Sequence, residues 1–281
     1  MLKSMYSGIS GMKSNQTKMD VVGNNVANVG TTGFKKSTTR FSDALNQTVI
    51  YSSVPGGKAD DPNVIGGVNP GQVGIGAKVS GIFRNMAQGA IQPTGRPTDL
   101  AMDGDGFFVV GVGPNQNAYT RDGSFTLDAN GNLVTSDGYK VMGVDKGGNN
   151  KPIQIPKEER NPDGKMQKVL SFNISKEGKI SYLLADGTKV ENAQTLKIAI
   201  FHNPEGLESL SGNLYGQTAN SGEPMFNTKH GLVNQGAIEM SNIDLSEEFT
   251  EMIVTTRAFQ AASKVITTSD ELLQEIINLK R

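Results

Sequence analysis

The sequence predicts an α+β protein in which N- and C-terminal α-helices form a coiled-coil domain and a mainly-β domain of sandwich or barrel type is inserted between them. Two observations carry this prediction. Apolar residues recur every seven positions near both ends of the chain, which is the spacing of a coiled coil. Short apolar runs between paired turn residues fill the centre at about the ten-residue spacing of β sandwiches and barrels.

These patterns divide the 281 residues into three parts. We expect a terminal coiled-coil domain over 1–30 and 243–281, an extended linker over 31–77, and a β-rich outer domain over 78–242. The composition agrees, because 34 glycines and only 36% hydrophobic residues favour a turn-rich β centre over a large α/β core.

The N-terminal helix is predicted from the first residue to about Asn28. Its apolar heptad positions are Leu2, Met5, Ile9, Met12, Met19 and Val26, interrupted by Gln16 and Gly23. The Asn- and Gly-rich run that follows tolerates the left-handed backbone that ends helices. The first 41 residues are basic on balance, so a membrane-surface helix or an organellar presequence is an alternative. The absence of Trp and of an Arg- and Ser-rich pattern weighs against both.

The C-terminal helix is predicted over about 244–281. Its heptad positions are Met252, Phe259, Ile266, Leu273 and Ile276, with the small residues Thr255 and Ser269 in the second register. Four further residues widen the stripe: Ala258, Val265, Leu272 and Leu279. Acidic residues open the helix at Glu247 and basic residues close it at Lys280, which complements the helix dipole. An ordinary core-facing helix remains the alternative to a helix that packs against other chains.

Between the helices, the sequence predicts two segments of different structure, a loop followed by a β domain. Residues 44–76 are rich in turn pairs such as Pro55-Gly56 and Asn69-Pro70, which predicts a loop that is either a disordered linker or a segment ordered only on assembly. The β domain follows, with hairpin turns expected at Asp122-Gly123, Asn130-Gly131 and Asp137-Gly138. The expected strands are 99–102, 106–110, 117–121, 123–127, 132–135, 139–142, 169–174, 179–184, 195–201 and 236–240.

No constellation for catalysis, cofactor binding or metal binding is recognised, so we expect no enzyme and no cofactor. Gly74–Gly76 begins like a dinucleotide fingerprint, but Val79 stands where the third glycine belongs. The histidines His202 and His230 lack neighbouring ligands, and the stretch from Asp128 lacks the glycine and glutamate of a calcium loop. Cysteine is absent, and no run approaches the ~20 apolar residues of a membrane span. The net charge of −1 indicates neither nucleic acid nor stable membrane insertion.

Several motifs resemble the axial proteins of the bacterial flagellum, the rod and hook family. One of them is the N-terminal family motif formed by Asn24, Asn25, Ala27, Asn28, Gly33 and Phe34. Ser7–Met12, Asp99–Phe108, Tyr119–Phe125 and Ser241–Leu245 match in the same order along the chain. Within the family, the start Met1–Met12 and the segment Glu247–Ile253 resemble most closely the short hook protein of Gram-positive bacteria.

The resemblance implies a homopolymer, a helical tube in which the terminal helices form the inner layer and the β domains the outer wall. It also implies export through the flagellar type III apparatus without a cleaved signal peptide, assembly beneath a hook cap, and contact with neighbouring rod and hook–filament junction proteins. The expected location is the hook and basal body of the flagellum.

The function expected from these motifs is a hook subunit, part of a curved, flexible universal joint that transmits motor torque to the filament. The alternative is the distal rod protein, a straight drive shaft, because residues 44–76 resemble its insertion. A β-rich surface binding module remains a remote third class, since it explains the centre of the chain but not the heptads at both ends.

Overall fold

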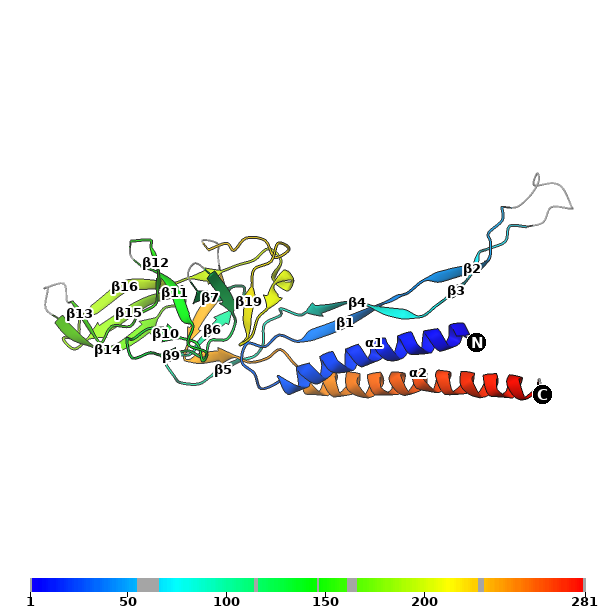
Figure 1. Cartoon of the computed structure of the whole chain (residues 1–281). Coiled ribbons are helices and arrows are strands. Elements are labelled where there is room, and N and C mark those ends of the chain that lie inside the picture. Colours follow the sequence, from blue (N-terminus) through cyan, green and yellow to red (C-terminus); the bar gives the residue numbers. More distant parts are fainter. Residues whose placement is uncertain are drawn as a thin grey trace. The chain divides into compact units, whose positions relative to one another are not determined.

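The computed structural model describes residues 2–54, 66–113, 116–145, 147–160, 166–226 and 230–279. The predicted turn at Pro55-Gly56 and the basic helix end at Lys280 lie outside the described residues. The chain divides into two compact units (Figure 1). Unit 1 comprises Met1–Val26, Ser37–Phe83 and Leu245–Arg281, and unit 2 comprises Ala27–Lys36 and Arg84–Asp244.

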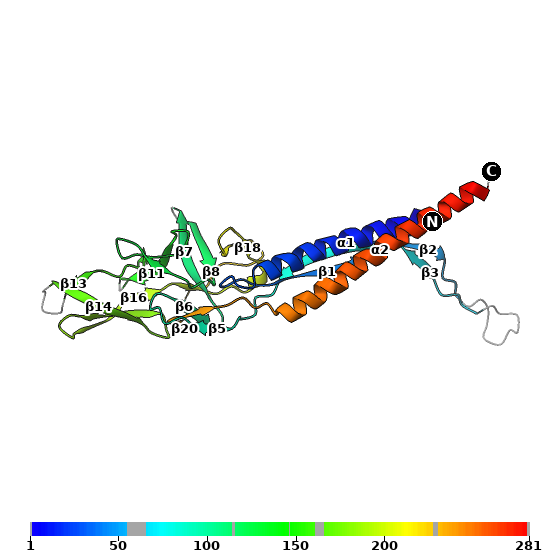
Figure 2. The same cartoon turned by 90° about the horizontal axis from the view of Figure 1, so that it is seen from below.

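Unit 1 is organised around two long helices, α1 (Leu2–Ala27) and α2 (Leu245–Leu279). Both lie within two residues of their predicted bounds, and Glu247 and Glu248 occupy the first turn of α2 as expected. The helices run antiparallel side by side, with the N-terminus of α1 and the C-terminus of α2 at one end (Figures 1 and 2). Neither described helix has the apolar length that crossing a membrane requires.

The rest of unit 1 is a pair of antiparallel ladders. β1 (Ser37–Asp43) pairs with β4 (Ala77–Arg84), and β2 (Asn46–Ile50) pairs with β3 (Gly71–Gly74). The sequence predicted a loop over 44–76, whereas the structure forms β2 and β3 there. The β-branched run Thr48–Ile50 favours an extended backbone, and the facing strand satisfies its hydrogen bonds despite the neighbouring turn residues.

Unit 2 is built mainly of β-strands, so the α+β class predicted from the sequence is confirmed. Its described strands form a 13-stranded sheet with the main order β13-β14-β15-β16-β11-β7-β8-β19-β18 and two separate pairs, β20-β6 and β21-β5. The strands are β5 (Ile91–Pro93), β6 (Leu100–Asp103), β7 (Phe107–Gly113), β8 (Gln116–Thr120), β9 (Thr126–Leu127), β10 (Leu133–Val134), β11 (Lys140–Asp145), β12 (Asn150–Pro152), β13 (Glu158–Arg160), β14 (Met166–Ile174), β15 (Lys179–Leu184), β16 (Lys189–Leu196), β17 (Ile198–Ala199), β18 (Glu208–Ser209), β19 (Leu214–Gly216), β20 (Leu232–Gln235) and β21 (Ala237–Glu239). A short 3-10 helix, η1 (Pro204–Gly206), precedes β18.

Strand β7 lies between the two hydrophobic cores of unit 2. Successive side chains of a strand point to opposite faces, so Phe108 and Val110 enter one core and Phe107 and Val109 the other. Phe108 meets Phe125 edge-on at 5.4 Å between ring centroids, and Phe107 meets Phe201 edge-on at 5.9 Å. The continuous apolar run of β7 thus reflects burial on both faces.

The predicted hairpin turns are right in two cases and wrong in one. Gly131 and Gly138 have positive φ, as Asn-Gly and Asp-Gly turns require. Asp122-Gly123 does not form a hairpin turn. A Cβ on Gly123 would lie 1.5 Å from the Leu100 carbonyl oxygen, so this glycine is needed because the backbone of β6 passes against it.

Candidate assembly interface

The helix pair of unit 1 is joined along a seam of small and polar residues. On α1 the residues that contact α2 include Ser4, Gly8, Gly11, Lys18 and Asn25, and their alternating spacing by four and three adds Asn15 and Val22 to the seam. On α2 the contacting residues include Glu248, Ala262, Ile266 and Ser269, and the same alternation adds Met252, Thr255, Phe259 and Leu273 to the seam. The hydroxyls of Ser4 and Ser269 are hydrogen-bonded at 3.3 Å, and the ammonium of Lys18 pairs with the carboxylate of Glu251 beside the seam. The fully buried members include Gly8, Thr255 and Ser269.

The close approach of the helices depends on Gly8. A Cβ at this position would lie 2.9 Å from Cγ1 of Ile266 and 3.2 Å from the carbonyl oxygen of Ala262. At Gly11, one turn further on, a Cβ would lie at an ordinary 3.6 Å from Cβ of Ala262. The spacing of the helices is therefore set by a residue without a side chain at Gly8.

Asn25 joins three elements of unit 1 at the other end of the helix pair. Its side-chain amide donates hydrogen bonds to the Glu248 carboxylate at 3.0 Å and to the Ser37 carbonyl at 2.8 Å. Its side-chain oxygen accepts from the Ser37 amide at 3.0 Å. Asn25 is completely buried, so its amide cannot bond to water, and these three hydrogen bonds take the place of the bonds that it would make in solvent.

Strand β4 lies against a different face of α1. Ser14 donates to the Ala77 carbonyl at 3.3 Å, and Ser10 accepts from the Ala77 amide at the same distance. Gly76 has a φ of +132°, and a Cβ there would lie 2.0 Å from the Ser10 hydroxyl. Serines and glycine again allow close backbone packing.

The residues predicted as the polymer interface lie within this seam on α2 and next to it on α1. On α2, Met252, Phe259, Ile266 and Leu273 are half-buried seam members, whereas Ile276 is exposed. On α1, the half-buried Met5, Met12, Met19 and Val26 and the exposed Ile9 each follow a seam residue by one position. The Leu2 side chain lies outside the described residues. The apolar heptad positions of α1 were predicted from the sequence as the interface, whereas the small residues that face α2 were not. Gly8 and Gly11 belong to the same alternation by four and three as Ser4 and Asn15, so this signal was present in the sequence.

The predicted family motif occupies the end of α1 and the turn after it. Besides Asn25, Asn28 accepts the Thr31 hydroxyl at 3.1 Å, while Asn24 and Ala27 are exposed and Phe34 is half-buried. Gly33 is buried with φ +67°, and a Cβ there would lie 2.6 Å from the Asp122 amide nitrogen. The motif therefore combines a helix end with a turn that only glycine makes without strain.

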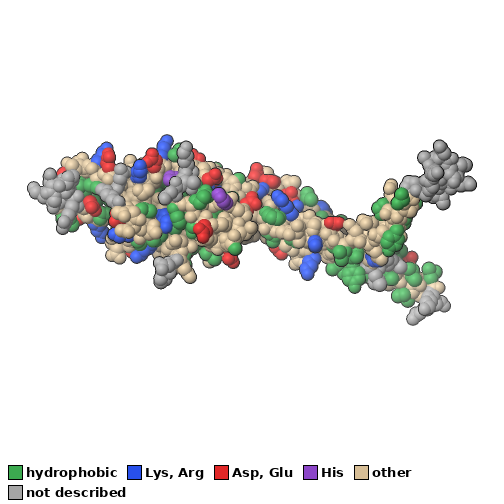
Figure 3. Space-filling view, turned by 90° about the horizontal axis from the view of Figure 1, so that it is seen from above, with side chains coloured by type: hydrophobic (Ala, Val, Ile, Leu, Met, Phe, Trp, Pro, Cys, Tyr) green, Lys and Arg blue, Asp and Glu red, His purple; other side chains and the backbone are tan. Residues whose placement is uncertain are grey.

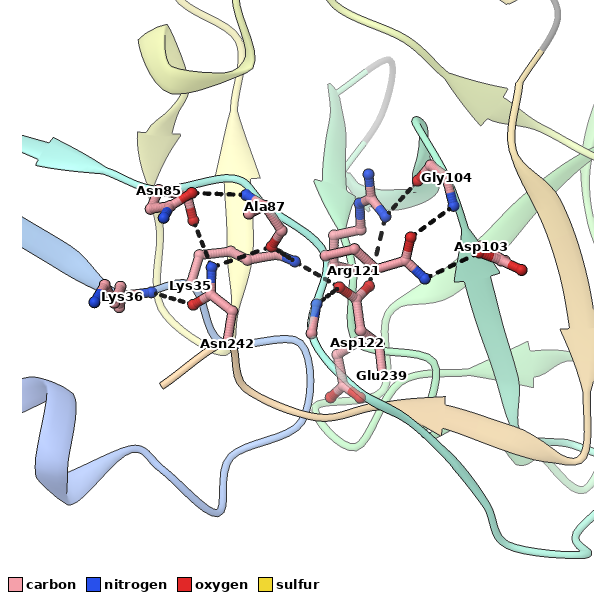
Figure 4. Close-up of polar contacts among 12 residues, drawn as sticks. Lys35, Lys36, Asn85, Ala87, Asp103, Gly104, Arg121, Asp122, Glu239 and Asn242 are labelled. Carbon is pink, nitrogen blue, oxygen red and sulfur yellow. Dashed lines mark hydrogen bonds and ion pairs between the residues drawn. The ribbon is translucent and has the colours of Figure 1, made fainter. Parts of the chain in front are cut away.

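Unit 2 contains a buried ionic cluster of Lys35, Glu239 and Arg121 (Figure 4). The ammonium of Lys35 lies 2.5 Å from Oε1 of Glu239 and donates to the Ala87 carbonyl at 2.8 Å. The Arg121 guanidinium lies 3.5 Å from Oε2 of Glu239 and donates to the Gly104 carbonyl at 2.9 Å. The side chains of Lys35 and Glu239 are fully buried and that of Arg121 is 5% exposed.

Burial disfavours both cations of this cluster, and Glu239 opposes that effect. Desolvation lowers the pKa of Lys35, while the charge and hydrogen bond of Glu239 act to raise it. Desolvation likewise lowers the pKa of Arg121, against the attraction of Glu239 and Asp105. Asn242 extends the network through the Lys36 amide and the Asn85 carbonyl. The cluster thus holds together four segments of unit 2 that are distant in sequence: 27–36, 84–89, 104–121 and 237–244.

The described residues contain no group of three or more acidic or His side chains placed to hold a metal ion. His202 is exposed, and Nδ1 of His230 lies 2.7 Å from the carbonyl oxygen of its neighbour Gly231. The hydrogen bonds and ion pairs described above link segments of the chain to one another. Large apolar side chains remain exposed on unit 1, where Figure 3 shows hydrophobic side chains gathered.

The fold and the site define a class of protein in which two terminal helices pair and a β unit is inserted between them. Comparisons with known proteins identify the family to which this chain is similar. Family profiles match in three places: "Flagella basal body rod protein" at residues 5–35, "Flagellar hook protein FlgE/F/G D1 domain" at 101–182, and "Flagellar basal body rod FlgEFG protein C-terminal" at 234–279.

Full-length relatives give the same result. The chain is 45% identical over 286 residues to the flagellar basal-body rod protein FlgG of Bacillus subtilis, with all of both chains covered. It is 37% identical over 285 residues to FlgG of Borreliella burgdorferi, again with complete coverage. It is 26% identical to the flagellar hook protein FlgE of the same organism, over an alignment of 448 positions that covers both chains. The chain belongs to the flagellar rod and hook protein family, a family of structural proteins.

Proposed function

We propose that this chain is a subunit of the rod of the flagellar basal body, the straight drive shaft that was the alternative in the sequence analysis. The observation that carries the proposal is its 45% identity, without unmatched ends, to a relative named a rod protein. The hook protein among the relatives is more distant, and its alignment is far longer than this chain. The relatives therefore favour the distal rod, the alternative of the sequence analysis, over the expected hook subunit.

In this proposal α1 and α2 form a coiled coil in the inner layer of a tube, and unit 2 forms part of the outer wall. The alternating three- and four-residue seam supports a coiled coil, because that spacing keeps one stripe of each helix facing its partner. The exposed apolar residues of unit 1 support polymerisation. Large exposed apolar surfaces on soluble chains mark sites of protein contact.

The ladder of β2 and β3 supports the rod over the hook. It lies in the segment that resembles the insertion of the distal rod protein, and its strands carry large exposed apolar side chains at Val49, Ile50 and Val73. A strand ladder with such side chains is suited to fill space between neighbouring subunits, which would stiffen a tube. Export through the type III apparatus, assembly beneath a cap, and contact with adjoining rod and hook–filament junction proteins belong to the same proposal.

The hook subunit is the second candidate. It rests on the resemblance of Met1–Met12 to short hook proteins and on the full coverage of the chain by the hook relative. The two functions differ in the structure that is lost when the chain is absent.

The test is electron microscopy of hook–basal bodies from cells that lack the chain and from complemented cells. A rod subunit predicts basal bodies with an incomplete rod and no hook, and antibody to residues 84–244 should label the straight rod of complemented cells. Complete rods that lack only the curved hook, with label along the hook after complementation, would transfer the assignment to the hook. Normal rods and hooks without label would overturn both.

A further inference from the structure

Each helix of unit 1 carries a second heptad stripe beside the seam. On α2 this outer stripe consists of Val254, Ala258, Ala261, Val265, Thr268, Leu272 and Leu279. On α1 the outer stripe consists of Met5, Ile9, Met12, Gln16, Met19, Gly23 and Val26. Each member of the α2 stripe through Leu272 precedes a seam residue by one position, and each member of the α1 stripe follows one.

The direction of the offset places the two outer stripes on opposite sides of the helix pair. Viewed with the C-terminus of α1 toward the observer, one step forward along α1 turns a side chain about 100° counterclockwise. Because α2 runs the other way, one step backward along α2 also turns a side chain about 100° counterclockwise. The seam faces point at each other, so equal rotations in the same sense carry the outer stripes to opposite sides.

The outer stripes are incompletely covered within one chain. Val254 is 56% exposed, Leu272 54% and Leu279 86%, and on α1 Ile9 is 48% exposed. The methionines of α1 are half-buried and flexible, so they adapt to an uneven partner surface. On α2 the outer stripe contains the small residues Ala258 and Ala261. A contact between the two stripes would set long, flexible side chains against small ones, a combination that allows close packing.

The charges of the helices favour contact of an α1 outer stripe with an α2 outer stripe over contact between two stripes of the same kind. Helix α1 carries three lysines and one aspartate, a net charge of +2, whereas α2 carries two basic and six acidic residues, a net charge of −4. Contacts between two α1 helices or two α2 helices would bring like charges together. Contact between α1 and α2 brings opposite charges together, as it already does between Lys18 and Glu251 beside the seam.

We propose that the outer stripe of α1 in one copy of the chain packs antiparallel against the outer stripe of α2 in a second copy. The contact repeats between copies the pairing already present within one. It joins two different surfaces on opposite sides of the helix pair, so it does not close on itself and propagates into an open helical assembly. This inference rests on the proposed function and specifies the contact by which the tube would grow.

Cysteine cross-linking tests the contact, because the natural chain contains no cysteine. Full-length I9C and V265C chains are produced together in cells, and the isolated basal bodies are treated with a short bis-maleimide. Val254→Cys and Leu272→Cys replace V265C in parallel samples, because heptad stripes fit at several registers. The control pair is Lys13→Cys with Thr267→Cys, exposed positions outside both stripes.

We expect a two-chain product only when an α1-stripe variant and an α2-stripe variant are present together. Chains with both cysteines should give a ladder of longer products, as an open assembly requires. Products from a single variant alone would show like-with-like packing and overturn the proposal. Equal yield from the control pair, or no product at any of the three registers, would also overturn it.

A charged substitution gives an independent readout. Leu272→Glu places a carboxylate in the α2 stripe and should abolish incorporation of the chain into basal bodies, whereas Thr267→Glu, at an exposed position outside both stripes, should not. If natural chains are found in the rod but L272E assembles as well as T267E, the stripe contact is wrong and the proposed function stands. If natural chains are absent from basal bodies, the proposed function itself fails.

Discussion

Glu239 is a single carboxylate that serves two buried cations. It lies 2.5 Å from Lys35 and 3.5 Å from Arg121, and it also accepts the Gly89 amide at 2.9 Å. The cluster brings together residues 204 positions apart in the chain. Removing this carboxylate leaves two buried cations without the anion that both contact.

We predict that Glu239→Gln destabilises unit 2 by about 3–5 kcal/mol, the usual cost of leaving a buried charge unpaired. The measurement is urea unfolding of the full chain, followed by the near-ultraviolet signal of the tyrosines. In the double variant Lys35→Met, Glu239→Gln, part of this loss should be recovered, because one unpaired cation is gone. A double variant no more stable than E239Q would contradict this account of the cluster.

At the scale of elements, the distance between α1 and α2 depends on Gly8, which lies against Ile266, more than on Gly11, which lies against Ala262. Gly8 and Gly11 lie on the same face of one helix, yet only Gly8 has Ile266 within 3 Å of the position of a Cβ. Alanine stabilises a helix interior relative to glycine by about 0.5–1 kcal/mol when space is available.

We predict that Gly11→Ala raises the midpoint temperature at which the assembled protein dissociates and that Gly8→Ala lowers it. The first substitution adds helix propensity at an ordinary contact distance, and the second forces Ile266 and the backbone of Ala262 away. Because the two variants make the same chemical change on one helix, each controls for the other. Equal shifts in both would show that the seam at Gly8 is not closely packed.

At the scale of the whole molecule, buried tyrosines link the stability of unit 2 to alkaline pH. Burial raises the pKa of Tyr182, Tyr119 and Tyr215 above the ordinary value. In the unfolded chain these phenols lose their protons first, so the folded state binds more protons above about pH 10. Stability is therefore complete below the unfolded pKa and falls as pH rises through the folded pKa.

We predict that the urea midpoint falls between about pH 9 and pH 11, and that it falls less steeply in Tyr182→Phe. At neutral pH the same variant should lose about 1 kcal/mol, because the Tyr182 hydroxyl donates to the Gln154 carbonyl at 3.0 Å. The exposed Tyr51 supplies the matched control, and Y51F should behave as the natural chain does. An unchanged alkaline slope in Y182F would remove Tyr182 from this explanation.

Local patterns in the sequence predicted much of this fold. The heptads and the Asn-rich helix end located both helices, and Asn-Gly and Asp-Gly pairs located the turns at Gly131 and Gly138. These features depend on neighbours a few residues away, so they can be recognised from the sequence. The segment 44–76 was misjudged because its turn residues suggested a loop, whereas cross-strand pairing of β2 and β3 decided its structure.

The sequence by itself determined that both termini are helical, that each helix carries heptad stripes, and that the centre is β. Only the tertiary structure decided which stripe of α1 faces α2, because two registers one residue apart have the same period. It also decided that Glu239 serves Lys35 and Arg121, and that Gly123 is required by the passing backbone of Leu100. Periodicity states how residues are spaced along an element, whereas burial and charge pairing depend on which distant segment lies against it.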